Sequence, residues 1–148
     1  MSRPRPTSVA HATQIIQSFT EDPAWHPFAQ IDLESGRFVG MTTFYDTSES
    51  LRTVAIGATW LSRSAWRTGI NRESKRLLLT YAFEELECVR VVWHVDCLNE
   101  RSQTAVLALG AQREGVLRKH RRRLDGSWRD TVVFSLLDTE WQKLTRFA

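Results

Sequence analysis

Between Asn71 and Val95 the spacing of apolar residues changes from a helical to a strand-like pattern, and this change constrains the fold more than any other feature of the sequence. Apolar residues within Asn71–Leu86 recur at helical spacing, which predicts a helix with one buried face. The segment that follows, Val89–Val95, reads VRVVWHV, and it is β-rich and apolar enough to form a central strand. A helix that leads into a central strand must pack on the sheet. The fold is therefore predicted to be α/β or α+β.

In the residues before Asn71 the sequence pattern predicts one helix and three strands. A helix is expected over Thr7–Asp22, with Pro23 as its stop, after an irregular start that Pro4 and Pro6 impose. Three β-rich runs separated by short turns then predict an antiparallel meander. They are His26–Leu33, Arg37–Tyr45 and Thr53–Leu61, with a turn at Ser35-Gly36 and a polar link over Asp46–Ser50.

Downstream, a second helix and a hairpin complete the predicted order. A helix is expected over Asn99–Leu109, with Asn99 as its N-cap and Gly110 as its C′ residue. Asp125-Gly126 is a strong hairpin signal, and it joins two predicted strands, Ala111–Arg123 and Ser127–Leu137. The resulting order, α, β-β-β, α-β-α, β-β, predicts a mixed sheet flanked by helices.

Composition narrows the class of protein. The 148 residues suffice for one domain with a sizeable core, so residues 1–148 are expected to form a single domain. A net charge of +3 does not by itself indicate a nucleic-acid partner. Cys88 and Cys97 make no disulfide framework, and the sequence contains neither a membrane-length apolar run nor a signal peptide. We therefore expect a soluble, cytoplasmic protein that acts away from membranes.

The turn before the predicted helix within Asn71–Leu86 is a candidate phosphate site. A glycine at a helix start lets backbone N–H groups approach a phosphate, and Gly69 holds that position in SAWRTGINRESK. Arg67 adds a full positive charge, and Asn71 is expected to cap the helix. The alternative is an ordinary loop that ends at a helix.

Ser102 is the second candidate functional residue. It lies on the apolar stripe of its helix with Ala105, Val106 and Leu109, so its hydroxyl should point toward the sheet. A hydroxyl in that position either binds a partner or donates back to a helix carbonyl. The sequence leaves both readings open.

These residues carry a family resemblance that runs from about Ile31 to Trp141. The motifs WRTGINRESK, LNERS, LGA and RDTVVFSLLDTEW, in this order and spacing, resemble the GNAT superfamily of N-acetyltransferases. Within it they resemble the branch typified by ribosomal-protein N-terminal acetyltransferases. The resemblance implies a mixed, mostly antiparallel, twisted sheet in which the strand ending at Leu61 splays from the strand beginning at Val89.

The resemblance also implies a cofactor, a reaction and a set of site residues. Acetyl-CoA would be the co-substrate, and the acceptor a primary amine, either a protein N-terminus or a small molecule. No metal is implied, and His94, Cys97 and Cys88 have no spacing that fits a zinc site. Asn99 and Ser102 would lie near the thiol end of the cofactor. The pyrophosphate would be held by Arg67, Thr68, Gly69, Ile70 and Asn71, and the pantetheine by backbone at Trp60 and Leu61.

Three positions depart from the pattern of the family. Ala55 stands where this branch often has a glutamate that accepts or relays a proton, and Ala58 where it has a tyrosine. Val106 replaces the tyrosine that other GNAT proteins use as general acid. His120 is the best substitute base on chemistry, because its ordinary pKa lies near neutral pH, although a solvated hairpin histidine is the alternative.

Two further features leave alternatives open. Members of this branch usually begin with a further strand and helix, so the acceptor pocket is expected to be more open here, or completed by a second subunit in a homodimer. The basic run Arg118–Arg123 either forms a solvated sheet edge or contacts phosphate backbones of a nucleic acid. The second reading makes the chain a catalytically impaired GNAT-fold binding protein that acts through this hairpin.

Overall fold

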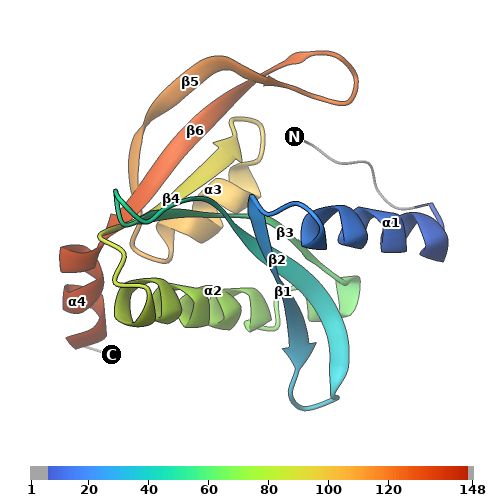
Figure 1. The fold of residues 1–148 in the computed structure, drawn as a ribbon, viewed down its shortest axis with the longest axis horizontal. Coiled ribbons are helices and arrows are strands. Elements are labelled where there is room, and N and C mark those ends of the chain that lie inside the picture. Colours follow the sequence, from blue (N-terminus) through green and yellow to red (C-terminus); the bar gives the residue numbers. More distant parts are fainter. Residues whose placement is uncertain (1–6, 147–148) are drawn as a thin grey trace.

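A computed structural model describes residues 7–146, which form one six-stranded sheet with helices around it (Figure 1). The strands lie in the order β1-β2-β3-β4-β6-β5. The helices are α1 (Val9–Thr20), α2 (Ile70–Thr80), α3 (Glu100–Leu107) and α4 (Asp138–Arg146). The strands are β1 (Trp25–Asp32), β2 (Arg37–Ser48), β3 (Thr53–Leu61), β4 (Arg90–Asp96), β5 (Gln112–Arg122) and β6 (Trp128–Leu137).

The mixed, mostly antiparallel sheet predicted from the sequence is confirmed. β1, β2 and β3 form the expected antiparallel meander, and β6 pairs antiparallel with both β4 and β5. The polar link expected over Asp46–Ser50 was wrong, because β2 continues through Asp46 to Ser48. Its end still pairs with β3, at Ser48 and Thr53, and this pairing keeps the polar residues in the strand. The predicted irregular start before residue 7 lies outside the described residues.

The helix boundaries correct three details. Gly69, at φ +92°, is the N-cap of α2, so Asn71 is the second helical residue and not the cap. The left-handed backbone that turns the chain into the helix favours glycine, which explains why the cap falls there. α2 ends at Thr80 and widens into a π-helical turn, Tyr81–Glu85, before the predicted end. Asn99 caps α3 as predicted, whereas Gly110 lies two residues beyond the C-cap Ala108.

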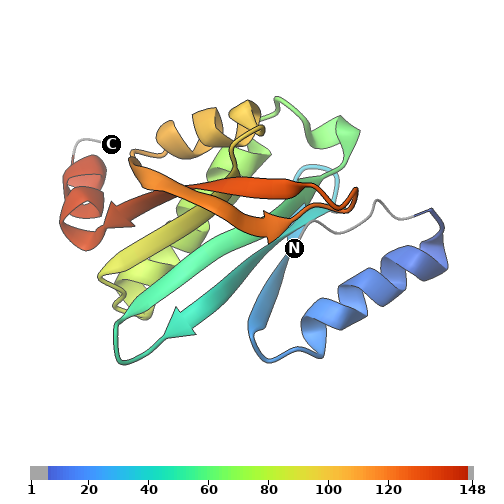
Figure 2. The ribbon, with the colours of Figure 1, turned by 90° about the horizontal axis from the view of Figure 1, so that it is seen from above.

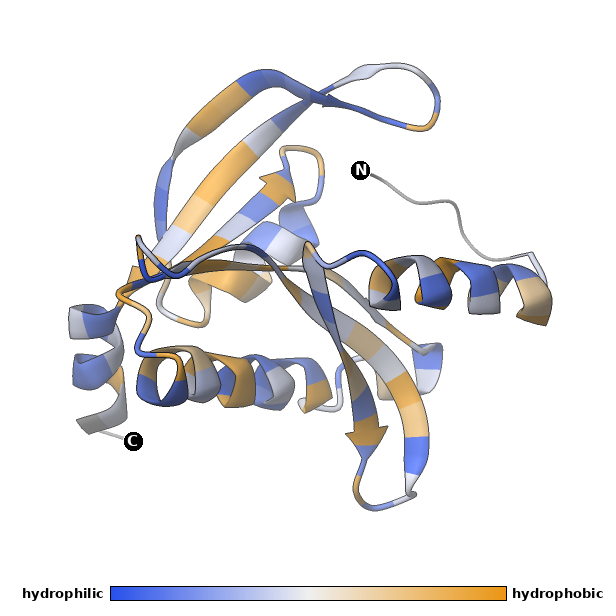
Figure 3. Ribbon diagram, in the orientation of Figure 1, coloured by the Kyte–Doolittle hydropathy of each residue, from blue (hydrophilic) through white to orange (hydrophobic). Residues whose placement is uncertain are grey.

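The core lies between the sheet and three helices, and Figure 3 shows apolar residues gathered where they meet. Alternate residues of β4, namely Val91, Trp93 and Val95, face this core with Leu79 of α2 and Val106 of α3. α4 contributes Trp141 to the core. The opposite face of the sheet is covered differently, by the β5–β6 hairpin that rises above it (Figures 1 and 2).

β3 and β4 diverge as the resemblance implied. They pair in parallel at only three positions, the last being Ala55 with Val92. Beyond this point β3 follows β2 and β4 follows β6, so a gap opens between two neighbouring strands. Ala58 has a left-handed φ of 47°, and the β2–β3 register shifts beside it, as in a β-bulge. The splay exposes strand backbone at the centre of the sheet.

Candidate functional site

The turn before α2 has the form of an anion-binding cradle. Gly69 caps the helix without a side-chain hydrogen bond, and the first helical bond runs from the N–H of Glu73 to the carbonyl of Gly69. The N–H groups before it point out of the helix end, where the helix dipole is positive. A Cβ placed on Gly69 would meet no atom within 4 Å, so the space in front of the turn is open.

Neighbouring side chains shape this turn. The hydroxyl of Thr68 donates to the carbonyl of Ala65 at 2.8 Å and thereby fixes the loop. Arg67 takes a left-handed φ of 62°. Asn71 Oδ1 is buried and has no hydrogen-bond donor within residues 7–146. The five residues predicted to hold a pyrophosphate, 67–71, therefore do lie together around one helix start.

Trp66 closes the side of the turn that faces α3. Its indole N–H donates to the carbonyl of Leu61 at 3.0 Å, and the guanidinium of Arg101 lies 4.8 Å from its ring centroid. The carbonyl of Leu61, one of the backbone groups predicted to contact pantetheine, thus already has a donor. Trp60, the other predicted contact, is 44% exposed at the end of β3.

A buried lysine lies beneath the bulge of β3. Lys75 of α2 is only 6% exposed, and its ammonium donates to the hydroxyls of Thr42 at 2.5 Å and Thr59 at 2.6 Å. No carboxylate pairs with it among the described residues. Burial without a counter-charge lowers the pKa of Lys75 to about 7. No local pattern in the sequence predicts that this lysine is buried.

Asn99 and Ser102 meet at the start of α3, next to the end of β4. The side-chain oxygen of Asn99 accepts from the backbone N–H of Ser102 at 3.1 Å, so Asn99 is committed to capping. The hydroxyl of Ser102 is half-buried, and it makes no hydrogen bond within residues 7–146. It does not donate back to a helix carbonyl, which was one of the two predicted outcomes.

A groove of about 580 Å³ lies on the hairpin side of the sheet, where β3 and β4 begin to separate. Ala55 and Val92 line it from the sheet, and Val116 and Leu117 from β5. At one end Arg90 and Glu114 form a two-bond ion pair, which lowers the pKa of Glu114 to about 2. Ala55 thus faces the groove from the position where the resemblance expects a glutamate.

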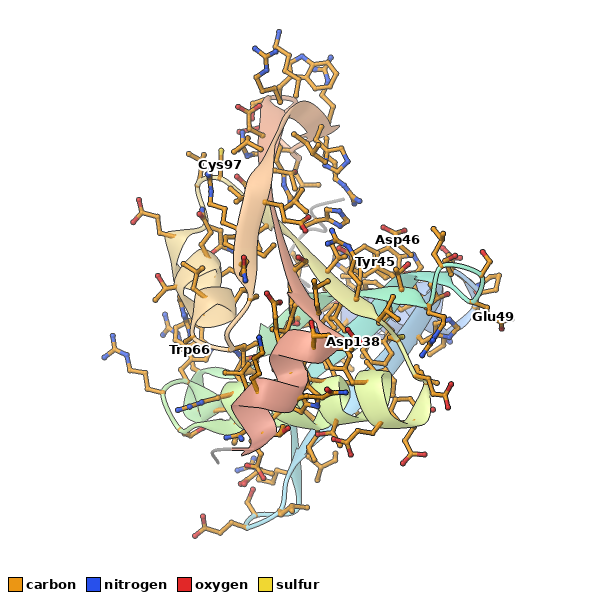
Figure 4. All side chains as sticks on the ribbon, turned by 90° about the vertical axis from the view of Figure 1, so that its left-hand side faces the viewer. Tyr45, Asp46, Glu49, Trp66, Cys97 and Asp138 are labelled. Atoms are coloured by element: carbon orange, nitrogen blue, oxygen red, sulfur yellow. The ribbon has the colours of Figure 1, made fainter. Side chains whose placement is uncertain are left out.

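The other end of the groove carries His94. Its Nδ1 and the hydroxyl of Tyr45 form a hydrogen bond of 3.0 Å. Figure 4 shows Tyr45 and Asp46 on the side of the sheet from which the hairpin rises, opposite α2 and α4. His120, the predicted substitute base, lies next to this pair, with its ring centroid 5.9 Å from that of His94. His120 itself does not line the groove.

Two side chains of the basic run, those of Arg122 and Arg123, are engaged within the protein. Arg123 forms two hydrogen bonds with Asp96, at 2.8 and 2.9 Å, and these lower the pKa of Asp96 to about 2. Arg122 lies 4.2 Å from the ring centroid of Trp128 and donates to the carbonyl of Gly126. Residues 118–122 of the run lie on the edge strand β5, as the solvated-edge alternative predicted, and Arg123 follows its end.

Neither a metal centre nor a membrane helix is seen in the part of the chain that the structure describes. Residues 7–146 hold no group of three or more His, Cys, Asp and Glu side chains suited to a metal ion. No helix within the same range is long and apolar enough to span a membrane. Cys88 and Cys97 are both free thiols.

Comparison with known proteins places this geometry among acetyltransferases. Residues 1–112 match the model of the acetyltransferase (GNAT) domain. The chain is 34% identical over 110 residues to the Bacillus subtilis (strain 168) protein called "Putative ribosomal N-acetyltransferase YdaF". That match covers 74% of this chain and 59% of YdaF, so the chain spans less than two thirds of that relative.

Solved structures show the same relationship. A GCN5-related N-acetyltransferase from Brucella melitensis superposes with a TM-score of 0.92 at 26% identity, covering 97% of this chain and 65% of that one. A structure described as a "putative ribosomal-protein-serine acetyltransferase from Vibrio cholerae" gives a TM-score of 0.78 at 25% identity, covering 88% and 76%. The fold of this chain thus matches that of solved acetyltransferase structures.

Proposed function

The chain belongs to the GNAT family of acetyltransferases, and we propose on this basis that it transfers the acetyl group of acetyl-CoA to a primary amine. The observation that carries the proposal is the splay of β3 and β4 next to the open, glycine-capped start of α2. A long thioester cofactor needs both an anion site and a slot with free backbone groups. The two features lie at the same end of the sheet.

Residues 67–71 would hold the pyrophosphate. The N–H of Ile70 donates a long hydrogen bond, of 3.5 Å, to the hydroxyl of Thr68. The N–H groups that follow it at the start of α2 and the charge of Arg67 suit an anion, and the open space at Gly69 leaves room for one. The backbone at Trp60 would bind the pantetheine, and Leu61 would contribute through whichever groups Trp66 leaves free. Acetyl-CoA supplies an activated acyl group on a thiol leaving group.

Ser102 and Asn99 would serve the thiol end. Asn99 holds the start of α3 through its cap, and this fixes the backbone of Ser102. The free hydroxyl of Ser102 can donate a hydrogen bond to a leaving thiolate and so stabilise the developing negative charge. His120, on the hairpin side, is one candidate for the group that takes the proton of the acceptor amine.

We propose that the acceptor is the N-terminus of a protein or a small amine that enters through the groove lined by Ala55. YdaF and the Vibrio structure carry names that refer to ribosomal substrates, which supports a peptide amine as the first acceptor to test. The proposal includes a single domain over residues 1–148, and it leaves a second subunit as one way to complete the acceptor side.

Calorimetric titration with acetyl-CoA tests the cofactor site. Gly69→Trp fills the open space in front of the turn and should abolish binding. Gly36→Trp is the matched control, because Gly36 also has a left-handed φ, of 65°, and no atom within 4 Å of an added Cβ. Binding by wild type and Gly36→Trp, but not by Gly69→Trp, supports the proposal. Absence of binding by the wild type overturns it and favours the binding-protein alternative.

A further inference from the structure

We propose that His94 is the general base of the reaction, taking a proton from the acceptor amine in place of the glutamate that Ala55 replaces. This inference rests on the proposed acetyl transfer and deepens it, because it names the group that activates the acceptor. Three independent features of the structure carry it: the place of His94 in the groove, its hydrogen bond to Tyr45, and the charges around it.

His94 lies where a base is needed. Ala55 pairs with Val92, and His94 follows two residues later on β4, so it faces the same side of the sheet. Both Ala55 and His94 line the groove. The strands diverge directly after the Ala55–Val92 pair, so His94 stands at the junction of the acceptor groove and the cofactor gap. A histidine there reaches toward the same space as a side chain at position 55.

Tyr45 reaches His94 by crossing β3. It lies on β2 opposite Ala55, and its ring passes over Gly57, where an added Cβ would be 2.7 Å from Cε1 of Tyr45. Only glycine at position 57 leaves room for this path. Trp25 of β1 stacks on the Tyr45 ring at 4.9 Å between centroids and holds it from the other side. The hydrogen bond between Tyr45 and His94 thus bridges the gap between the splayed strands.

The hydrogen bond fixes which ring nitrogen of His94 faces Tyr45, namely Nδ1. Burial raises the pKa of Tyr45 to about 12, so the phenol stays neutral and can either donate to Nδ1 of His94 or accept from Nδ1–H. In the catalytic form Nδ1–H of His94 donates and the Tyr45 oxygen accepts. Neutral histidine carries one ring proton, so this tautomer leaves the lone pair on Nε2. Nε2 makes no hydrogen bond within residues 7–146 and is available to a substrate.

The surrounding groups favour a neutral imidazole. Asp46 of β2, His120 and Arg121 of β5 and Arg129 of β6 act on His94, and Arg129 also donates to its backbone carbonyl at 3.0 Å. Burial is the largest influence and Arg121 the next, and together they hold the pKa of His94 below its ordinary value, against the opposing effect of Asp46. A base must be unprotonated at the working pH, and His94 meets that requirement near pH 7.

The step balances as follows. A bond forms between the acceptor nitrogen and the acetyl carbonyl carbon, and the carbon–sulfur bond breaks, with its electron pair leaving on sulfur. The proton lost by nitrogen goes to Nε2 of His94, while Nδ1–H stays bonded to Tyr45. The imidazolium then returns its proton to solvent or to the departing thiolate, and no oxidant or metal is required.

Two measurements test the inference. The first is the ¹⁵N chemical shifts of the His94 ring in the free protein, which identify the tautomer without any cofactor. The Nδ1–H form is expected, with a pKa for His94 below the ordinary histidine value of 6.5. His26, an exposed histidine on β1, is the control in the kinetic test that follows. A dominant Nε2–H form overturns the proposal, because the nitrogen that faces the substrate would then have no lone pair.

The second measurement is kcat/KM against pH with a peptide acceptor, comparing His94→Asn, His120→Asn and His26→Asn. Asparagine at position 94 can still donate to Tyr45 but cannot take a proton at neutral pH. We therefore expect His94→Asn to lower kcat/KM by about 10²- to 10⁴-fold. Its pH profile should also lose the acidic limb, in which kcat/KM falls as the base becomes protonated. Imidazole added to His94→Ala should restore part of the rate, whereas His26→Asn should match wild type. A full rate in His94→Asn, or loss of the limb only in His120→Asn, overturns the proposal.

Failure of the underlying function has a different signature. If the wild type transfers no acetyl group to any amine, the proposed function fails, and this inference falls with it whatever the tautomer. If the wild type is active and His94→Asn is equally active with an unchanged pH profile, only the assignment of the base fails.

Discussion

Replacing Lys75 by Met should make the protein more stable at neutral pH. Lys75 is buried beneath the β3 bulge, contacts only two threonine hydroxyls among polar partners in the described chain, and has no carboxylate partner there. Burial lowers its pKa from 10.5 to about 7. Methionine has a similar length and no charge, and Thr42 and Thr59 can still bond to each other, since their hydroxyls lie 2.9 Å apart.

The size and sign of the effect follow from proton linkage. Between pH 7 and 10.5 the unfolded chain binds a proton at Lys75 that the folded chain does not, so the free energy of unfolding rises with pH in this window. A shift from 10.5 to about 7 corresponds to a rise of about 2 kcal/mol between pH 7 and pH 9. Below about pH 7 the group is charged in both states and the slope vanishes.

Urea unfolding at several pH values measures this directly. The difference in free energy of unfolding between wild type and Lys75→Met should shrink by about 2 kcal/mol from pH 7 to pH 9, with the mutant the more stable at pH 7. Lys143→Met, at an exposed position on α4, is the control and should show no such trend. A constant difference across this pH range would refute the assignment of an uncompensated buried charge.

Three further predictions follow from the site. Ser102→Ala should lower kcat by about 10- to 100-fold while calorimetry shows unchanged affinity for acetyl-CoA, because the hydroxyl is proposed to act on the leaving thiolate; an unchanged kcat would remove Ser102 from the chemistry. Gly57→Ala should displace the Tyr45 ring and break its bond to His94, seen as a changed ¹⁵N tautomer signature, since an added Cβ would lie 2.7 Å from that ring; an unchanged signature would contradict the packing described. Arg123 lowers the pKa of Asp96 from 3.8 in the unfolded chain to about 2 in the fold, so the stability that this pair contributes should be lost as the pH falls from about 4 to 2. Arg123→Gln should lose less stability over the same pH range, measured by acid titration, and an equal loss in the two proteins would show that the pair is not formed.

The elements that the sequence predicts well are those with a local cause. Helical and strand periods, proline stops and the Asp125-Gly126 turn depend on neighbouring residues, and the structure confirms the order that they imply. The errors fall where long-range pairing or backbone strain decides. β2 continues through polar residues because β3 pairs with it, and Gly69 rather than Asn71 caps α2 because the chain turns there in a left-handed conformation.

The candidate site was only partly predictable for the same reason. Residues 67–71 and the Asn99–Ser102 pair are close in sequence, so motif and periodicity sufficed to group them. His94, Tyr45 and Gly57 come from three strands, and their meeting depends on register and on a bulge that no local pattern reveals. One signal was available: alternation along β4 puts Val92 and His94 on the face opposite Val91, Trp93 and Val95, and hence on the side of Ala55.

The central claim is acetyl transfer to a primary amine, and one measurement tests it most directly. Wild-type protein is mixed with acetyl-CoA and a panel of peptides with free N-termini and of small amines, and both the released thiol and the mass of each acceptor are followed. We predict thiol release matched mole for mole by an acceptor that gains one acetyl group. Release without an acetylated acceptor, or neither product at any acceptor in the panel, would contradict the account.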